Sequence, residues 1–342
     1  MSMPTRIVSI VVCAYVGIVA LMALVYAIGP ERLVWGGVLL FLPQIALAVP
    51  GLILLPFAVW RARHLTWLLI AALLTVAVPL MGLSWGSPQA AEGVPIRFMT
   101  YNVQLWQRRN VPTILNEILA ADPDVLCLQD ARDAKNTRFA SYLQGRNMAM
   151  FGQYVFVSKF PIVDATVGDI SYDGETHTYL RARIDVAGTE VVIFNAHLVT
   201  PRDALNPLRS PSLWRLGLSE IRQNQSQRMR QARQLVEDSR AITGPLVIVG
   251  DLNAPPASLV TRMMTDRGLV DAFAAAGRGY GYTFGHTLLI GRPFLRLDRI
   301  LASPHLTPVR AWVGGAAGSD HRPVIADMVL TRPKAQSLGP KD

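Results

Sequence analysis

The fold is decided by the stretch Leu246-Val247-Ile248-Val249-Gly250-Asp251-Leu252-Asn253. Its four apolar, mostly β-branched residues, with prolines on both sides, predict a short strand that is buried on both faces. Gly250 permits a tight turn at the end of that strand. Asp251 and Asn253 then lie two positions apart, so both side chains can point out of the strand end in one direction. A carboxylate and an amide held together on a rigid strand suit chemistry on a proton and a phosphoryl oxygen, although both residues are also common in turns.

The composition differs between the two parts of the chain. Of the 342 residues, 51% are hydrophobic and only 17% are charged. The first 91 residues contain four basic residues and one acidic residue, which leaves 29 basic and 23 acidic residues for the remainder. That remainder has a net charge of about +6. Its length, about 240 residues, is sufficient for one large core.

Three uncharged apolar runs fill the first part, at residues 7–28, 34–59 and 65–83. A helix needs about 20 apolar residues to cross a bilayer, so each run is a candidate transmembrane helix. The middle run contains three prolines, which predict either a kinked helix or a re-entrant segment. A cleaved signal peptide is the alternative for the first run, but that run is too long and lacks a small-x-small cleavage site. We expect three membrane helices within residues 1–83.

The charges between the runs predict the orientation in the membrane. Arg6 precedes the first run and residues 61–64, Arg-Ala-Arg-His, connect the second and third, whereas the Glu31-Arg32 connection is neutral. Positive loops stay in the cytoplasm. An odd number of crossings then places everything after residue 84 outside, which predicts a multi-pass protein of the cell membrane with an extracytoplasmic domain. Tryptophans flank the second and third runs, a position typical of the membrane interface: Trp60, Trp67 and Trp85.

The rest of the chain divides into a linker (residues 84–95), a folded domain (96–330) and a flexible tail (331–342). Strand-like and helix-like segments alternate in the domain, with several hairpins, which predicts an α/β fold with mixed sheets. The predicted strands are 96–102, 125–129, 154–157, 162–167, 179–186, 190–196, 246–249, 297–301, 309–313 and 324–329. The predicted helices are 111–121, 139–144, 216–239 and 258–266.

Polar side chains lie at the ends of six predicted strands, where a packed core would not place them. They are Asn102, Asp130, His197, Asp251 with Asn253, Asp298, and Asp320 with His321. Each has an ordinary explanation on its own, such as a helix cap for Asp130 or an ion pair with Arg296 or Arg299 for Asp298. Their repeated occurrence at strand ends favours one shared site. Asn and Asp oxygens suit Mg²⁺ or Mn²⁺, whereas a zinc site would require more His or Cys at close spacing.

The order of these motifs resembles the endonuclease/exonuclease/phosphatase superfamily. The matching motifs are Tyr-Asn-Val (101–103), Leu-Gln-Asp (128–130), Asn-Ala-His-Leu (195–198), Gly-Asp-Leu-Asn (250–253), Asp-Arg-Ile (298–300) and Ser-Asp-His (319–321). The superfamily includes pancreatic-type deoxyribonucleases, abasic-site endonucleases, neutral sphingomyelinases and inositol-polyphosphate 5-phosphatases. The resemblance covers residues 96–330 and implies a four-layer α/β sandwich, two mixed sheets flanked by helices, with the site at one edge.

The same resemblance implies a divalent metal, Mg²⁺ or Mn²⁺. Asn102 and Asp130 would hold the metal, and Asp320 would be a further ligand or would lie just behind the ligands. The metal would polarise a phosphoryl oxygen and neutralise developing charge. One residue departs from the family pattern, which usually has Glu where this chain has Asp130. The carboxylate remains, but its side chain is one methylene shorter.

Five residues would carry the catalytic roles that the resemblance implies. Asp251 would orient or deprotonate the attacking water, and Asn253 would hydrogen-bond the scissile phosphate. His321 would contact that phosphate or transfer a proton, held by Asp298 in an Asp–His pair. His197 would be the second histidine that faces the phosphate.

The motifs indicate a phosphoester or phosphoanhydride bond but not the molecule that contains it. The membrane anchor resembles the membrane-anchored bacterial branch of the superfamily, which includes teicoplanin-resistance-type proteins. That likeness favours a phosphorylated lipid or a polyprenyl pyrophosphate, with the bilayer as the other partner and no protein partner implied. The alternative is a membrane-tethered nuclease, because a net charge of +9 favours polyanions. The sequence has no basic stripe interleaved with aromatic residues of the kind expected for single-strand binding, however.

Two further alternatives concern the role of the domain and of one segment. A non-catalytic scaffold would use the fold only for binding, which the full set of polar strand ends disfavours. Residues 201–240 contain eight arginines against four acids, together with Trp214 and several leucines. This segment could form a membrane-facing wall of the site, or it could be an ordinary solvated helix.

Overall fold

The central strand predicted at residues 246–249 is β9 (Leu246–Asp251), and it lies within a six-stranded sheet. The sheet has the order β10-β12-β9-β8-β7-β6. Strands β8 and β9 are parallel, and the other neighbours are antiparallel. The remaining strands of this sheet are β6 (Ile162–Asp169), β7 (Thr178–Val186), β8 (Thr189–His197), β10 (Val270–Asp271) and β12 (Asp298–Ala302).

A second six-stranded sheet has the order β13-β14-β2-β3-β5-β4. Strands β2 and β3 are parallel, and the others pair in the antiparallel sense. The strands are β2 (Val94–Asn102), β3 (Val125–Gln129), β4 (Asn147–Phe151), β5 (Tyr154–Ser158), β13 (Leu306–Val313) and β14 (Val324–Leu330). Strand β4 was not predicted from the sequence, because this exposed edge strand has no run of buried residues.

The two sheets pack face to face and helices cover their outer faces, so the predicted four-layer α/β sandwich is confirmed. Helices α5 (Val111–Ala121) and α6 (Ala140–Leu143) pack on the second sheet. Helices α8 (Trp214–Arg240) and α9 (Leu259–Asp266) pack on the first. The shorter elements are α7 (Arg202–Leu205), α10 (Ala272–Ala276) and β11 (Arg278–Gly279).

The structure describes residues 3–87, 89–104, 110–132, 134, 139–206, 214–288 and 291–331, so the predicted tail lies outside them except for Thr331.

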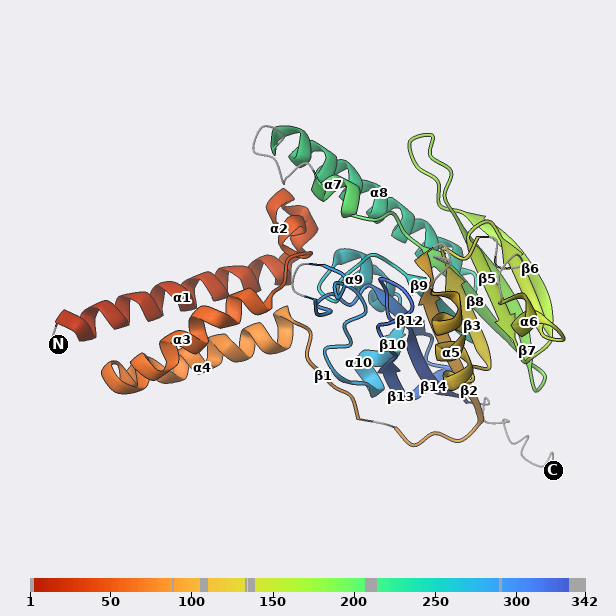
Figure 1. The fold of residues 1–342 in the computed structure, drawn as a ribbon, viewed down its shortest axis with the longest axis horizontal. Helices are drawn as coiled ribbons and strands as arrows, with labels where there is room; N and C mark the ends of the chain where they lie inside the picture. The colour runs from red at the N-terminus through yellow and green to blue at the C-terminus, as the bar shows by residue number, and fades with distance from the viewer. Residues whose placement is uncertain are drawn as a thin grey trace, which may run out of the picture.

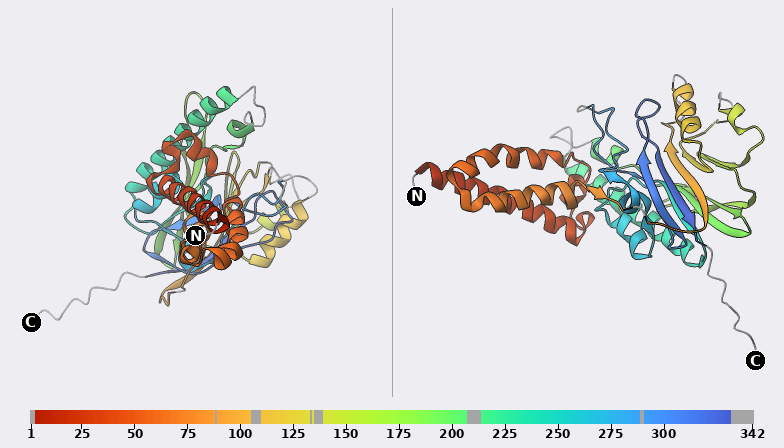
Figure 2. Two further views of the ribbon diagram at one scale, coloured as in Figure 1. Left: turned by 90° about the vertical axis from the view of Figure 1, so that its left-hand side faces the viewer. Right: turned by 90° about the horizontal axis from the view of Figure 1, so that it is seen from below.

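The N-terminal region of this computed structural model is a helical bundle that projects from the sandwich (Figures 1 and 2). Helix α1 (Met3–Ile28), helix α3 (Ile45–Arg61) and helix α4 (Thr66–Thr75), which η3 (Val76–Leu80) prolongs, lie side by side. Two stretches, Thr5–Ile28 and Arg63–Leu80, are long and apolar enough to cross a membrane. The short 3-10 turns are η1 (Pro30–Arg32) and η2 (Arg63–Leu65).

The single helix predicted at residues 34–59 is divided in the structure. A short helix, α2 (Val34–Leu39), ends before Pro43, and α3 begins after it at Ile45. Proline disfavours helical geometry at the preceding residue, which explains the break. The buried side chain of Gln44 donates to the carbonyl oxygens of Leu39 (3.1 Å) and Leu40 (3.2 Å), so the carbonyls at the end of α2 remain bonded. Pro50 and Pro56 are accommodated inside α3.

The bundle is attached to the sandwich by specific contacts. The carboxylate of Glu31 accepts hydrogen bonds from the Leu259 amide (3.1 Å) and the Ser258 hydroxyl, and so caps the N-terminus of α9. Arg262 of the same helix donates to the carbonyl oxygens of Tyr26 and Ala27 at the end of α1. The predicted linker is partly structured, because β1 (Ser84–Trp85) pairs with β11.

Candidate active site

The topology brings the polar strand ends to one edge of the sandwich. Strands β2, β3, β8 and β9 finish at this edge, and the antiparallel strands β12 and β14 start there. The register places Asp251 opposite His197 on one side and opposite Asp298 on the other. Asn102 is the last residue of β2, and His321 lies three residues before β14. The expectation of one shared edge is therefore met.

The turn after β9 depends on two unusual backbone conformations. Gly250 has φ 137°, and a Cβ atom there would collide with the carbonyl oxygen of Ala196. Only glycine fits at this position. Asn253 has φ 47°, in the left-handed region that non-glycine residues adopt at a cost. The backbone amide of Asn253 donates to the Oδ1 atom of Asp251 (2.9 Å), which fixes the carboxylate at the strand end.

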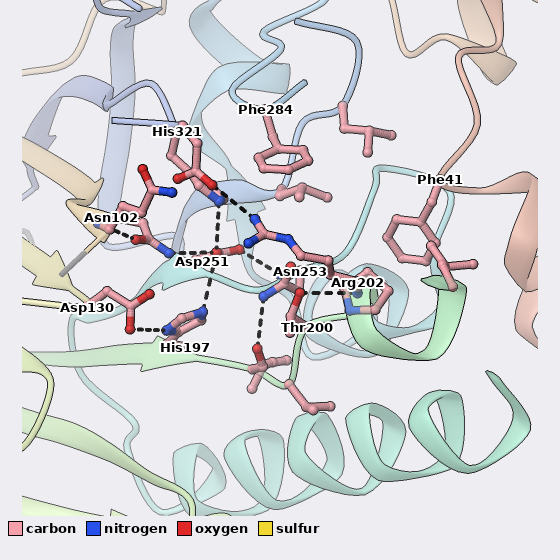
Figure 3. A pocket seen from close by; sticks show the side chains of 18 of the residues that line it. Phe41, Asn102, Asp130, His197, Thr200, Arg202, Asp251, Asn253, Phe284 and His321 are labelled. Atoms are coloured by element: carbon pink, nitrogen blue, oxygen red, sulfur yellow. Dashed lines mark hydrogen bonds and ion pairs between the residues drawn. The ribbon is translucent and has the colours of Figure 1, made fainter. Parts of the chain in front are cut away.

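Asp251 is the centre of the site (Figure 3). Its Oδ2 atom accepts a hydrogen bond from Asn102 Nδ2 (3.0 Å) and lies 3.5 Å from the Nε2 atoms of both His197 and His321. Burial raises the pKa of Asp251, but the two histidines and the two amide donors outweigh burial and lower it below the ordinary value. Asp251 is therefore a carboxylate at neutral pH, able to accept a proton or to orient water.

Asp298 holds His321 from the opposite side of the ring. His321 Nδ1 lies 2.8 Å from Asp298 Oδ2, and both side chains are buried. Burial lowers the pKa of His321, but the carboxylates of Asp298 and Asp251 raise it to about 10. The imidazole is consequently cationic at neutral pH, and it lines the pocket. The alternative that Asp298 pairs with a neighbouring arginine is wrong, because Arg296 and Arg299 pair with Asp271 instead.

His197 is oriented by groups of the second sheet. Its Nδ1 atom lies 2.8 Å from Gln153 Oε1 and 3.7 Å from Asp130 Oδ1, while its backbone amide donates to the Tyr154 hydroxyl (3.2 Å). This arrangement points Nε2 at Asp251. Asp130 has φ 49°, so the residue after β3 also adopts a left-handed conformation next to the site.

Two groups of side chains can be compared as metal sites. Asp251, Asp298 and His321 bring their ligand atoms within 4.8 Å of one another. The hydrogen bond between His321 Nδ1 and Asp298 Oδ2, however, already uses a ligand atom of each of these two residues. These three residues are better explained as an acid–base unit than as a metal centre.

The other group consists of Asn102, Asp130 and Asp320, which the sequence predicted as the metal-binding residues. All three line the same pocket. Two carboxylates and an amide offer the oxygen ligands that Mg²⁺ and Mn²⁺ prefer, so the residues present fit an oxygen-bound divalent cation. Asp320 also accepts a hydrogen bond from Arg202 Nη2 (2.9 Å), which compensates part of its negative charge.

The pocket has a volume of about 670 Å³ and is lined by residues that the sequence alone did not identify. Besides the predicted side chains, its lining includes Phe41, Gln153, His177, Arg202, Leu205, Phe284, Leu288 and Phe294. Arg202 lies four residues after the Asn-Ala-His-Leu motif (195–198), and this proximity could have indicated that it lines the pocket. Phe41 and Phe284 are far from all the predicted motifs in the sequence, so nothing there indicated that they line it.

Only part of the arginine-rich segment 201–240 faces the site. Arg202 lines the pocket. The buried Arg228 lies outside the pocket lining and donates to the carbonyl oxygen of Asn253 (3.2 Å). Arg230 and Arg240 instead form surface ion pairs. Residues 207–213 and the side chains of residues 214–216, including Leu213 and Trp214, lie outside the described part of the chain.

The fold and the site together define a four-layer α/β sandwich with a carboxylate–histidine centre at one edge. The sequence profile of the Endonuclease/Exonuclease/phosphatase family matches residues 99–321. This match covers more than half of the chain, so the protein belongs to that family. Among curated proteins, no sequence matches the chain.

Solved structures show the same fold. An endonuclease/exonuclease/phosphatase from Beutenbergia cavernae has a TM-score of 0.53 at 21% identity, over 69% of this chain and 72% of that one. A Bacteroides vulgatus protein of the same description has a TM-score of 0.55 at 16% identity, over 69% and 99% of the two chains. The human nocturnin catalytic domain, solved with a bound sulfate, has a TM-score of 0.52 at 20% identity, over 71% and 97%.

Proposed function

We propose that this protein is a membrane-anchored, divalent-metal-dependent phosphoester hydrolase that acts on a phosphorylated lipid or a polyprenyl pyrophosphate at the outer face of the membrane. The observation that carries the hydrolase assignment is the position of the buried Asp251 between two histidines, one of them held by Asp298. A structural core has no reason to gather these groups at a strand end beside an open pocket. Membership of the family supports the same chemistry.

The side chains of the site can be assigned roles in the attack of water on phosphorus. Asp251 orients the water and accepts its proton, because its lowered pKa keeps it ionised at neutral pH and its side chain lines the pocket. The cationic His321 stabilises the negative charge of the phosphoryl oxygens. Asn253 donates one amide hydrogen to Leu198 O (2.9 Å) and has a second one for the phosphate.

The remaining charge of the phosphate would be met by the metal and by Arg202. Asn102, Asp130 and Asp320 would hold Mg²⁺ or Mn²⁺, which when bound polarises a phosphoryl oxygen and neutralises charge on the leaving group. Arg202, whose side chain is 55% exposed at the pocket, can turn from Asp320 toward a phosphate oxygen. His197 directs its Nε2 atom at Asp251 while Gln153 Oε1 holds its Nδ1 atom.

The arrangement of the bundle supports the proposed membrane anchor and its orientation. The N-terminus and the turn with Arg61 and Arg63 lie at the end of the bundle far from the sandwich (Figure 1). That end would face the cytoplasm by the distribution of positive charge, and the sandwich would lie outside. Exposed tryptophans occur on the elements at both ends of the bundle: Trp60 and Trp67 beside the turn between α3 and α4, Trp35 on α2 and Trp85 on β1. Two such levels match the two interfaces of a bilayer.

The proposed activity is tested with the purified, detergent-solubilised full-length protein and Mg²⁺. Phosphate or head-group release from a polyprenyl pyrophosphate and a phospholipid is measured beside cleavage of a DNA duplex. We expect turnover of a lipid and none with Asp251→Asn. Turnover of DNA alone would replace the lipid assignment with the tethered nuclease, and turnover that persists in Asp251→Asn would remove the hydrolase site from this pocket.

The proposed orientation is tested separately with a reporter that is active only outside the cytoplasm. Fused after residue 342, the reporter should be active in cells that express the full chain. A reporter active only in the cytoplasm would reverse the assignment of the two faces. Neither result depends on the identity of the substrate.

A further inference from the structure

The pocket has two chemically different halves. The half around Asp251 contains the carboxylates, histidines and amides of the site. The other half is apolar and consists of Phe41, Leu205, Phe284, Leu288, Phe294 and Leu295. In Figure 3 the ring of Phe41 lies away from Asp251, beyond Arg202. The ring of Phe284 lies beside His321, with ring centroids 4.9 Å apart, where the two halves meet. A phosphate needs only the polar half, so the apolar half calls for a separate explanation.

The apolar half is built in part by the membrane-anchoring region. Phe41 lies in the break between α2 and α3 and packs against Phe294, Leu295 and Leu297 of the sandwich. The same ring also packs against the apolar core of the helical bundle. One side chain thus belongs to the wall of the catalytic pocket and to the bundle. Through Phe41 the apolar packing of the pocket wall is continuous with that of the bundle.

Exposed apolar side chains surround this junction. Leu33, Trp35 and Leu42, which flank Phe41 in the sequence, have exposed fractions of 46%, 55% and 49%, and Leu288 at the pocket has 43%. Helix α2, which carries Trp35 and lies between Leu33 and Leu42, is at the sandwich end of the bundle, where the proposed topology places the outer surface of the bilayer (Figure 1). Large apolar side chains gathered at such a level are explained by contact with lipid.

We infer that the pocket binds a phosphorylated amphiphile whose hydrocarbon chain lies along the wall of Phe41, Phe284, Leu288 and Phe294 while its phosphate lies against Asp251 and His321. The inference rests on the proposed function and deepens it, since it makes the membrane-anchoring region part of the substrate site. The chain enters from the outer leaflet at the level of Trp35 and Leu42. Phe41 is then a specificity-determining residue, because it contacts the hydrocarbon and not the reacting phosphate.

The inference can be tested by binding without turnover. Two phosphonates with the same head group, decylphosphonate and ethylphosphonate, are titrated calorimetrically into the full-length protein in detergent with Mg²⁺. Their C–P bond is not a phosphoester, so binding is measured even if the hydrolase assignment fails. Each buried methylene contributes about fourfold in affinity, so about three to four buried methylenes predict on the order of 100-fold tighter binding of the decyl compound.

The variant that tests the wall is Phe41→Ala, with Phe57→Ala as its matched control. Phe57 is a 48% exposed phenylalanine on α3, in the same bundle but not in the pocket lining. We expect Phe41→Ala to weaken decylphosphonate about tenfold and to leave ethylphosphonate unchanged, whereas Phe57→Ala changes neither. Leu288→Ala provides a second variant, because Leu288 is exposed and its replacement does not disturb the folded core. It should weaken the binding of decylphosphonate about threefold.

The outcomes separate the inference from the proposed function. Equal affinity of wild-type protein for both phosphonates, or equal effects of Phe41→Ala and Phe57→Ala, would overturn the inference even if phosphoesters are hydrolysed. Loss of ethylphosphonate binding in Phe41→Ala would also overturn it, because the residue would then act on the phosphate end. Selective loss of decylphosphonate binding supports it whether or not any phosphoester is turned over.

Discussion

The Nδ1 atom of His321 lies 2.8 Å from the Oδ2 atom of Asp298, and both side chains are buried. Asp298 thereby fixes the ring so that Nε2 faces Asp251 at 3.5 Å. We predict that Asp298→Asn lowers kcat on the order of 100- to 1000-fold with little change in KM, because the imidazolium loses the carboxylate that stabilises it. Steady-state kinetics on the substrate found for the wild-type protein provides the measurement.

The matched control for this change is Asp327→Asn. Asp327 also pairs with a cation, Arg97, at 2.6 Å, but it lies on the surface of β14 rather than in the pocket lining. Its kcat should equal that of the wild type. Equal kcat values for Asp298→Asn and wild type would show that the Asp298–His321 pair is only structural.

The metal assignment predicts different results for two substitutions of Asp130. Removal of divalent metal with a chelator should abolish hydrolysis, and Mg²⁺ or Mn²⁺ should restore it. Asp130→Asn removes a charged oxygen ligand, so the Mg²⁺ concentration needed for half-maximal activity should rise at least about tenfold. Asp130→Glu keeps the carboxylate and should stay within about tenfold of wild-type activity.

Titration of activity with Mg²⁺ for each variant provides the measurement. Asp130→Asn with an unchanged Mg²⁺ requirement would contradict the assignment of Asp130 to the metal. The same titration with Asp298→Asn distinguishes the two candidate groups of residues. Asp298 should affect kcat and leave the Mg²⁺ requirement unchanged, because its carboxylate is used by His321.

The sandwich and the edge that carries the site were predictable because both follow from local patterns. Buried strands such as β9 and β3 appear as short apolar runs, and the polar residues that follow them stand out against that background. Helix α5 was predicted with its observed limits, since Pro112 marks its first turn and its apolar spacing is regular. The motif order then sufficed to indicate the family.

The parts that could not be predicted depend on contacts between distant segments. Phe41 reaches the pocket only because α2 and α3 separate at Pro43 and pack on the sandwich. The ion pairs of Arg296 and Arg299 with Asp271 could not be predicted, because Asp271 is 25 and 28 residues away in the sequence whereas Asp298 lies between the two arginines. Sequence spacing does not decide which of two carboxylates a buried arginine contacts.

Arg228 offers a prediction in which activity and stability change in different directions. Its guanidinium is buried, donates to Asn253 O (3.2 Å) and lies 5.1 Å from the ring of Phe41. Burial lowers the pKa of Arg228 to about 10, so the group is still charged at neutral pH. Among the described residues, no carboxylate forms an ion pair with Arg228, and its hydrogen bond goes to a backbone carbonyl oxygen.

Replacement of Arg228 by methionine, which has similar length, removes a buried charge and its desolvation cost. We predict that Arg228→Met leaves the melting temperature unchanged or higher, whereas kcat falls about tenfold because Asn253 loses the donor that positions its backbone. Thermal melting and kinetics on the same preparation provide the measurement. A parallel loss of stability and activity would show that Arg228 serves the fold rather than the site.

Asp271 provides a prediction for stability that is independent of catalysis. It forms buried ion pairs with Arg299 and with Arg296 (3.4 Å), and its carboxylate caps α10 through the amides of Phe273 (3.0 Å) and Ala274 (3.1 Å). Burial raises the pKa of Asp271, but the two guanidinium groups and the amide donors outweigh burial, so the pKa lies below its ordinary value. We predict that Asp271→Asn costs about 3–5 kcal/mol at pH 7, because two buried cations lose their partner.

The pH dependence follows from the direction of the shift. A carboxyl group whose pKa is lower in the folded state stabilises the fold above its unfolded pKa of about 4, and that stabilisation is lost as the pH falls through the folded value. The difference in melting temperature between wild type and Asp271→Asn should therefore be full at pH 7 and should shrink below about pH 4. Asp327→Asn, which breaks a more exposed pair, should cost no more than about 1 kcal/mol. Equal shifts for the two variants at pH 7 would show that burial of the Asp271 pairs adds nothing to stability.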